Sequence, residues 1–127
     1  MKQFRLVDNV LGWLTFFVAA FVYCSTIEPT ASFWDCPEFI STGAKLEVGH
    51  PPGAPFFMLT ANIFSQFASD PSQVAMMVNT MSALLSATCI LFLFWSITHL
   101  TRRIFFNDGE AMSLPKMIAI EASGLVG

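Results

Sequence analysis

Residues 10–27 read VLGWLTFFVAAFVYCSTI, an uncharged and mostly apolar run of 18 residues. About 20 such residues, coiled as a helix, cross the hydrocarbon core of a bilayer, so the run predicts a first membrane span over about 10–27. A signal peptide is the alternative, because Lys2 and Arg5 precede the run. Its apolar centre would be shorter, however, and bulky residues stand at 21–23 where a cleavage site needs small ones. We therefore interpret the run as a retained span.

The composition agrees with a membrane protein. The chain of 127 residues is 54% hydrophobic and 12% charged, whereas globular domains are about 25% charged. The net charge of -3 argues against nucleic acid as a partner. We expect an all-α integral membrane protein whose first partner is the lipid bilayer.

Two further apolar segments follow. Residues 73–100 predict a second span, and 54–69 predict a helix lying at the membrane surface, with Phe56, Ile63 and Phe67 recurring at helical spacing. Polar residues inside the second span, among them Asn79, have two interpretations, close packing against other helices or a role in binding a ligand.

Basic residues set the expected orientation. Lys2 and Arg5 precede the first span and Arg102 and Arg103 follow the second, so both flanks are expected in the cytoplasm and residues 28–72 outside it. Residues 101–115 would be a cytoplasmic loop. The apolar residues from 116 onward are too few to span a bilayer, and we expect them to begin a truncated third span. The chain is then an N-terminal fragment, inactive and poorly folded without the remaining transmembrane helices.

The polar chemistry of the chain is concentrated between the two spans, where residues 28–53 read EPTASFWDCPEFISTGAKLEVGHPPG. Asp35 and Glu38 are spaced i, i+3, which places both carboxylates on one face of a helix over about 35–47. The same spacing is a capping box, in which each side chain accepts a backbone N–H of the other residue. The two interpretations are compatible.

Two side chains in the loop can carry positive charge. His50 precedes Pro51 and Pro52, a stiff segment expected to be extended, and is either an ordinary loop residue or part of a site. Lys45 is either a solvated charge, a partner for Glu38 or Glu47, or a phosphate ligand.

Metal and disulfide chemistry stay open. Asp35, Glu38 and His50 could ligate a divalent metal, but no metal site is assigned. The cysteines at 24, 36 and 89 lack metal-binding spacing, and a bridge between the first two is one alternative.

The loop resembles the first extracytoplasmic loop of the GT-C membrane glycosyltransferases, particularly the protein O-mannosyltransferases. It is most similar to multi-spanning proteins common in Bacteroidetes-type bacteria, a family with an animal member that O-mannosylates receptor ectodomains. The resemblance is carried by an acidic pair after the first span, a His-Pro-Pro about a dozen residues later, and these residues: Glu28-Pro29-Thr30, Ser32-Phe33-Trp34-Asp35-Cys36, Glu38-Phe39-Ile40, Lys45-Leu46 and Val48 to Pro55.

The resemblance implies transfer of a mannose-like sugar from a polyprenyl-phosphate carrier to Ser or Thr hydroxyls of an acceptor protein, with inversion. Asp35 would be the general base and Glu38 a second catalytic acid, although Cys36 and Pro37 separate two acids that are adjacent in the mannosyltransferases. The expected substrate-binding residues are Trp34, Lys45, His50, Pro51 and Pro52. The implied location is a bacterial inner membrane with residues 28–72 in the periplasm.

A non-enzymatic membrane protein is the competing hypothesis, either a transporter or a scaffold subunit of a complex. The decisive acid of a transporter normally lies inside a span, whereas Asp35 and Glu38 lie outside both expected spans. Neither the sugar, the carrier lipid nor the acceptor follows from the sequence.

Overall fold

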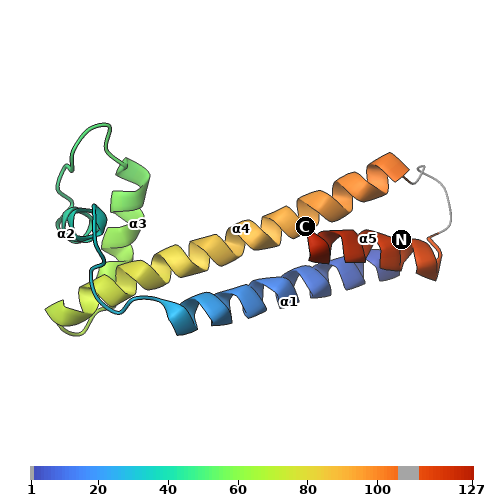
Figure 1. Cartoon of the computed structure of the whole chain (residues 1–127), viewed down its shortest axis with the longest axis horizontal. Helices are drawn as coiled ribbons and strands as arrows, with labels where there is room; N and C mark the ends of the chain where they lie inside the picture. The colour runs from blue at the N-terminus through green and yellow to red at the C-terminus, as the bar shows by residue number, and fades with distance from the viewer. Residues whose placement is uncertain (1, 106–111) are drawn as a thin grey trace. The chain divides into compact units, whose positions relative to one another are not determined.

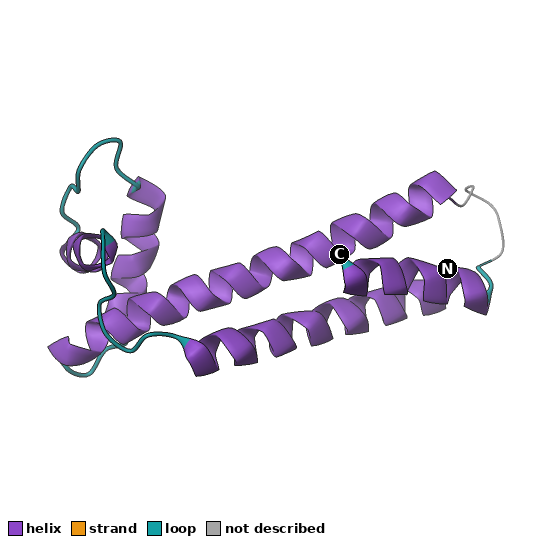
Figure 2. Ribbon diagram, viewed as in Figure 1, coloured by secondary structure: helices purple, strands orange, loops and turns teal. Residues whose placement is uncertain are grey.

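A computed structural model describes residues 2–105 and 112–127. The described residues form helices and loops, with no strand among them (Figures 1 and 2). This confirms the all-α fold class. The helices are α1 (Lys2–Thr26), α2 (Cys36–Lys45), α3 (Pro55–Ser65), α4 (Val74–Phe105) and α5 (Leu114–Val126), with a 3₁₀ turn at Pro71–Gln73 before α4.

Two helical segments are long and apolar enough to cross a membrane, namely α1 and the continuous run Pro71–Phe105. Only 11% and 28% of their most apolar windows are buried inside the described chain. The buried core helix of a soluble protein would show the opposite. Their exposed apolar side chains therefore suit contact with lipid or with other helices.

Several helix ends differ from the expected ones. α1 begins eight residues before the expected span, because Lys, Arg and Gln are good helix formers and continue the helix past the uncharged run. α4 extends to Phe105, into the expected loop at 101–115, and α5 begins at Leu114. Residues 106–111 of that expected loop lie outside the described residues. α3 ends at Ser65, four residues early, in turns where Phe67 N–H bonds Phe64 and Ala68 N–H bonds Ser65.

The chain divides into two compact units. The unit Tyr23–Leu85 holds α2, α3 and the first part of α4 around one apolar cluster. Its buried centre takes Ile40 from α2, Ala61 from α3, and Val78 and Met81 from α4. The burial of these side chains holds the three helices together.

α2 and α3 lie side by side (Figure 1). A Cβ atom added to Gly43 of α2 would lie 2.8 Å from the Ala61 Cβ atom of α3, so only glycine allows this approach. The Asn62 side chain of α3 donates a hydrogen bond to the Ala44 carbonyl at 2.8 Å. That bond satisfies one of the carbonyls left without a helical partner at the end of α2.

The other unit comprises the described residues of Met1–Val22 and Ser86–Gly127. Its helices also approach one another at small residues. A Cβ atom on Gly12 of α1 would lie 2.5 Å from the Trp95 ring of α4, and one on Gly124 of α5 would lie 2.7 Å from Thr98. Small residues at contacts are typical of packed membrane helices.

Candidate functional site

The clearest side-chain interaction in the loop joins Glu38 to His50, twelve residues apart. The His50 ring nitrogen Nδ1 lies 2.9 Å from each Glu38 carboxylate oxygen, and the His50 backbone N–H donates to Glu38 Oε1 at 2.8 Å. Phe39 packs edge-on against the His50 ring, with 6.2 Å between ring centroids. Glu38 thus ties the start of α2 to the segment before α3.

The two charges stabilise each other. The backbone N–H of His50, followed by its ring N–H, lowers the pKa of Glu38 below its usual 4.5. The hydrogen bond to Glu38 raises the pKa of His50 above its usual 6.5, and the charges of Glu38 and Asp35 add to this rise. Both shifts favour the charged forms, a carboxylate and an imidazolium.

Asp35 lies at the N-cap position of α2, but its side chain makes no capping hydrogen bond. The capping-box interpretation is therefore wrong. Glu38 bonds His50 in place of the backbone N–H of Asp35, and the Asp35 backbone is in the αR region (φ −79°, ψ −6°), not in the extended conformation of capping residues. The Asp35 carboxylate is exposed, and its charge reaches His50.

Trp34 precedes Asp35 and has a positive φ of 70°. Bulky side chains rarely adopt this conformation, and strained residues of this kind concentrate at functional sites. The Trp34 side chain is 92% exposed, so packing within the described chain does not account for its conformation. The indole is therefore open to a ligand.

His50, Pro51, Pro52 and Gly53 form a tight turn, closed by a hydrogen bond from the Gly53 N–H to the His50 carbonyl at 3.0 Å. The expected extended segment is wrong, because this hydrogen bond closes a turn and the chain reverses there. Gly53 has a φ of 75°, a left-handed conformation that favours glycine. The turn presents His50 to Glu38.

Lys45 lies at the other end of α2 and is exposed. Ten residues of helix separate it from Asp35, about 15 Å at 1.5 Å per residue. It forms no ion pair with Glu38 or Glu47 in the described part of the chain, where the ion pair of Glu38 is with His50. The structure thus joins Glu38 to His50, with the charge of Asp35 acting on His50, and places Lys45 at the other end of α2.

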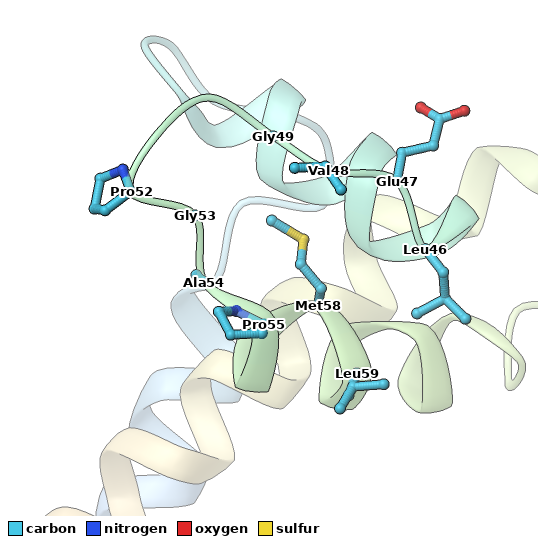
Figure 3. Close-up of a pocket in the computed structure, with 10 residues that line it drawn as sticks. All are labelled: Leu46, Glu47, Val48, Gly49, Pro52, Gly53, Ala54, Pro55, Met58 and Leu59. Carbon is cyan, nitrogen blue, oxygen red and sulfur yellow. The ribbon is translucent and has the colours of Figure 1, made fainter.

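Figure 3 shows a pocket of about 460 Å³, which shares lining residues with a small cavity at Glu38 and His50. Met58 and Leu59 of α3 contribute side chains to it, and the carboxylate of Glu47 points away from the other labelled side chains (Figure 3). Its lining residues are Leu46, Glu47, Val48, Gly49, Pro52, Gly53, Ala54, Pro55, Met58 and Leu59. No local spacing in the sequence signals this pocket, because the αL conformation of Leu46 and the turn after His50 create it.

Asn79 of α4 anchors the beginning of the loop. Its side-chain amide donates to the Glu28 carbonyl at 2.8 Å and to the Thr30 carbonyl at 3.1 Å. Glu28 in turn accepts from the Thr30 hydroxyl at 2.6 Å. The polar side chain inside the expected second span thus binds the backbone of the loop.

The described residues contain no group of three or more His, Cys, Asp or Glu side chains placed to hold a metal ion. Cys24, Cys36 and Cys89 are free thiols, so the alternative of a Cys24–Cys36 bridge is not realised.

Sequence reasoning missed Glu121. It lies in α5, is 5% exposed, and neither carboxylate oxygen has a hydrogen-bond partner among the described residues. A lone acid in an apolar helix gives no spacing signal, and only its burial identifies it. Acids in such surroundings are costly and are often functional.

The first testable prediction concerns the Glu38–His50 pair and pH. The pKa of Glu38 is lowered, so its contribution to stability is full above pH 4.5 and is lost as pH falls through the folded-state pKa of Glu38. The pKa of His50 is raised, so its contribution to stability is full below pH 6.5 and is lost as pH rises through the folded-state pKa of His50. We expect Glu38→Gln to return the pKa of His50 toward 6.5.

The measurement is the pH dependence of carbethoxylation of His50 in membranes, read by mass spectrometry, because only the neutral imidazole reacts. His99, which lies in α4, is the internal control. An unchanged pH profile of His50 in Glu38→Gln would contradict the pairing.

Comparisons with known proteins show the family of the chain. The family model described as protein O-mannosyl-transferase TMEM260 N-terminal domain matches residues 35–127, so the match begins at Asp35. The protein O-mannosyl-transferase tmem260 of Dictyostelium discoideum is 29% identical over 85 residues, which is 66% of this chain and 10% of that relative. The chain thus spans about a tenth of the length of the relative it matches. No solved structure is significantly similar to the chain. The family match covers well over half of the chain, and the chain belongs to the protein O-mannosyl-transferase TMEM260 N-terminal domain family.

Proposed function

We propose that the full-length protein transfers a mannose-like sugar from a polyprenyl-phosphate carrier to Ser or Thr hydroxyls of acceptor proteins, outside the cytoplasm, and that this chain supplies the loop that activates the acceptor. Membership of the family supports the proposal. So does the name of the relative from Dictyostelium discoideum, a protein O-mannosyl-transferase.

The observation that carries the proposal is the state of Asp35. Its carboxylate is exposed, makes no capping hydrogen bond, and lies close enough to His50 to influence the pKa of the imidazole. A Ser or Thr hydroxyl is a weak nucleophile near neutral pH, so a carboxylate within hydrogen-bond reach raises its reactivity by accepting its proton. Asp35 has the freedom that a general base needs.

Glu38 has a different role in this proposal. Its carboxylate is occupied by three contacts from His50, so Glu38 acts through His50 as a positioning residue. Since Nδ1 faces Glu38, Nε2 is the nitrogen through which the half-exposed ring meets a substrate hydroxyl. We propose that Trp34, which precedes Asp35, and Pro51 and Pro52, which follow His50, contact the sugar.

Lys45 is too far from Asp35 to join this acceptor-side cluster. In a displacement with inversion, the leaving phosphate lies on the face of the sugar opposite the attacking hydroxyl. We propose that the positive charge that stabilises this phosphate comes from outside the Asp35–Glu38–His50 group.

The orientation in the membrane gives the second prediction. In a background without the native cysteines, Lys45→Cys should react with a membrane-impermeant maleimide in sealed cells, since Lys45 is exposed in the loop expected outside. Arg103→Cys, also exposed, is the matched control and should react only after the membrane is opened. The reverse pattern would contradict the orientation and the proposed role of Asp35.

The experiment that tests the function itself is transfer of radiolabelled sugar from a polyprenyl-phosphate donor to a Thr-containing peptide, using membranes that hold the full-length protein. Absence of transfer with every polyprenyl-phosphate sugar tried would overturn the proposal.

A further inference from the structure

The apolar pocket and the Glu38–His50 pair share walls. A small cavity of about 10 Å³ is lined by Glu38, His50 and Met58 among others, and Gly49, Gly53 and Met58 also line the 460 Å³ pocket. Met58 is 8% exposed and is fixed by the Thr42 hydroxyl, which lies 3.3 Å from its sulfur. Any molecule in the pocket therefore lies next to the proposed acceptor-activating group.

Two parts of the reaction could supply an apolar occupant, namely the isoprenoid chain of the donor and a side chain of the acceptor. The charge of the pocket lining favours the acceptor. Glu47 is the charged residue among the described residues that line the pocket, and no Lys, Arg or His lies among them. The described lining therefore offers no positive charge to hold the phosphate of the carrier.

The stereochemistry of an inverting displacement also favours the acceptor as the occupant of the pocket. The base and the attacking hydroxyl lie on one face of the sugar, and the phosphate with its isoprenoid lies on the opposite face. The pocket shares a wall with the cavity of His50, which meets the acceptor hydroxyl in the proposed function, and it therefore lies on the side of the acceptor.

We propose that this pocket is a specificity subsite that binds one large apolar side chain of the acceptor polypeptide, close in sequence to the Ser or Thr that receives the sugar. The inference rests on the proposed function, since it assumes that Asp35 activates an acceptor hydroxyl. The volume lies within the range of roughly 300–1,000 Å³ of ligand pockets.

The test uses Leu59→Trp, which fills the pocket from α3. Ile63→Trp is the matched control, because Ile63 lies one turn later on the same helix, is equally exposed (59% against 58% for Leu59), and is outside the pocket. The probes are peptides with a single Thr, in which Leu is placed in turn at the three positions on either side and is compared with Gly.

We expect one Leu position to lower the KM of the wild-type protein roughly tenfold or more relative to Gly, the usual effect of one apolar contact. Leu59→Trp should remove that advantage and leave the KM for the polyprenyl-phosphate donor unchanged, whereas Ile63→Trp should keep the advantage. A rise in donor KM would identify the occupant as the isoprenoid and overturn the inference. Reduced abundance of Leu59→Trp alone would indicate that other parts of the protein fill the pocket, and this would also overturn it.

A binding readout separates this inference from the proposed function. Val48 is 95% exposed, so a photoreactive benzoylphenylalanine at this position should be tolerated. In the Asp35→Asn background we expect it to crosslink the best Leu peptide and not its Gly counterpart. Leu-dependent crosslinking together with no sugar transfer by the wild-type protein would sustain the subsite and overturn the proposed reaction. Transfer by the wild-type protein without Leu-dependent crosslinking would overturn the subsite alone.

Discussion

In the full-length protein, Asp35→Asn should lower sugar transfer by about 10²- to 10⁴-fold, the typical contribution of a general base, because an amide cannot accept the proton of the acceptor hydroxyl. Its abundance in the membrane should stay near that of the wild type. The structure sharpens this expectation. The Asp35 side chain makes no capping hydrogen bond, so even Asp35→Ala should avoid the cost of about 1 kcal/mol of a lost cap.

The matched control is Asp70→Asn. Asp70 is another acid of the loop, but its Oδ1 accepts the Ser72 N–H at 2.9 Å, which lowers its pKa and caps the 3₁₀ turn before α4. Asn replaces it well in this role, so transfer should be nearly unchanged.

Glu38→Gln should lower sugar transfer less than Asp35→Asn does. If Asp35→Asn retains more than about a tenth of the wild-type transfer, the loss is smaller than the smallest usual effect of a general base. That result would remove Asp35 from the role of base.

Gly43→Ala should reduce the amount of folded protein in the membrane several-fold, the usual consequence of about 1–2 kcal/mol of lost stability. The expected loss of stability is opposite to the usual effect, because Gly→Ala in an unobstructed helix stabilises the helix by up to about 1 kcal/mol. Here the new Cβ atom would lie 2.8 Å from the Cβ atom of Ala61, which is fully buried and cannot rotate away. The two helix backbones must separate, at an overpacking cost of about 1–3 kcal/mol.

Ala61→Gly removes the opposing Cβ atom, so the double variant Gly43→Ala with Ala61→Gly should recover much of the lost abundance. Abundance is measured by quantitative immunoblot of membranes, with transfer per molecule alongside. Wild-type abundance of Gly43→Ala would show that α2 and α3 do not pack at this contact. A double variant no better than the single one would give the same conclusion.

The helices were predictable because apolar run length is a direct physical requirement of the bilayer. The residues at which the helices begin and end were less predictable. Lys2 and Arg5 belong to α1 although charge excluded them from the expected span, since helix propensity continues beyond the apolar segment.

The candidate site was predictable in its members and not in its contacts. The resemblance in the loop singled out Asp35, Glu38 and His50, but the spacing of Asp35 and Glu38 favoured a capping box. A charged partner twelve residues away offered Glu38 stronger hydrogen bonds than the backbone of Asp35 did, and short-range patterns do not report on such a contact. The apolar pocket depends on the same turn, and it was therefore invisible in the sequence for the same reason.

The most direct measurement of the central claim, that Asp35 removes the proton of the acceptor, compares two acceptor peptides that differ only in Ser or Cys at the modified position. A thiol is a few per cent thiolate near neutral pH and is strongly nucleophilic, so it depends far less on a base. We predict that Asp35→Asn loses about 100-fold or more of the wild-type transfer to the Ser peptide and a much smaller fraction of the transfer to the Cys peptide. Equal losses on both peptides would contradict the claim, because they would mean that Asp35 positions the substrate and does not accept its proton.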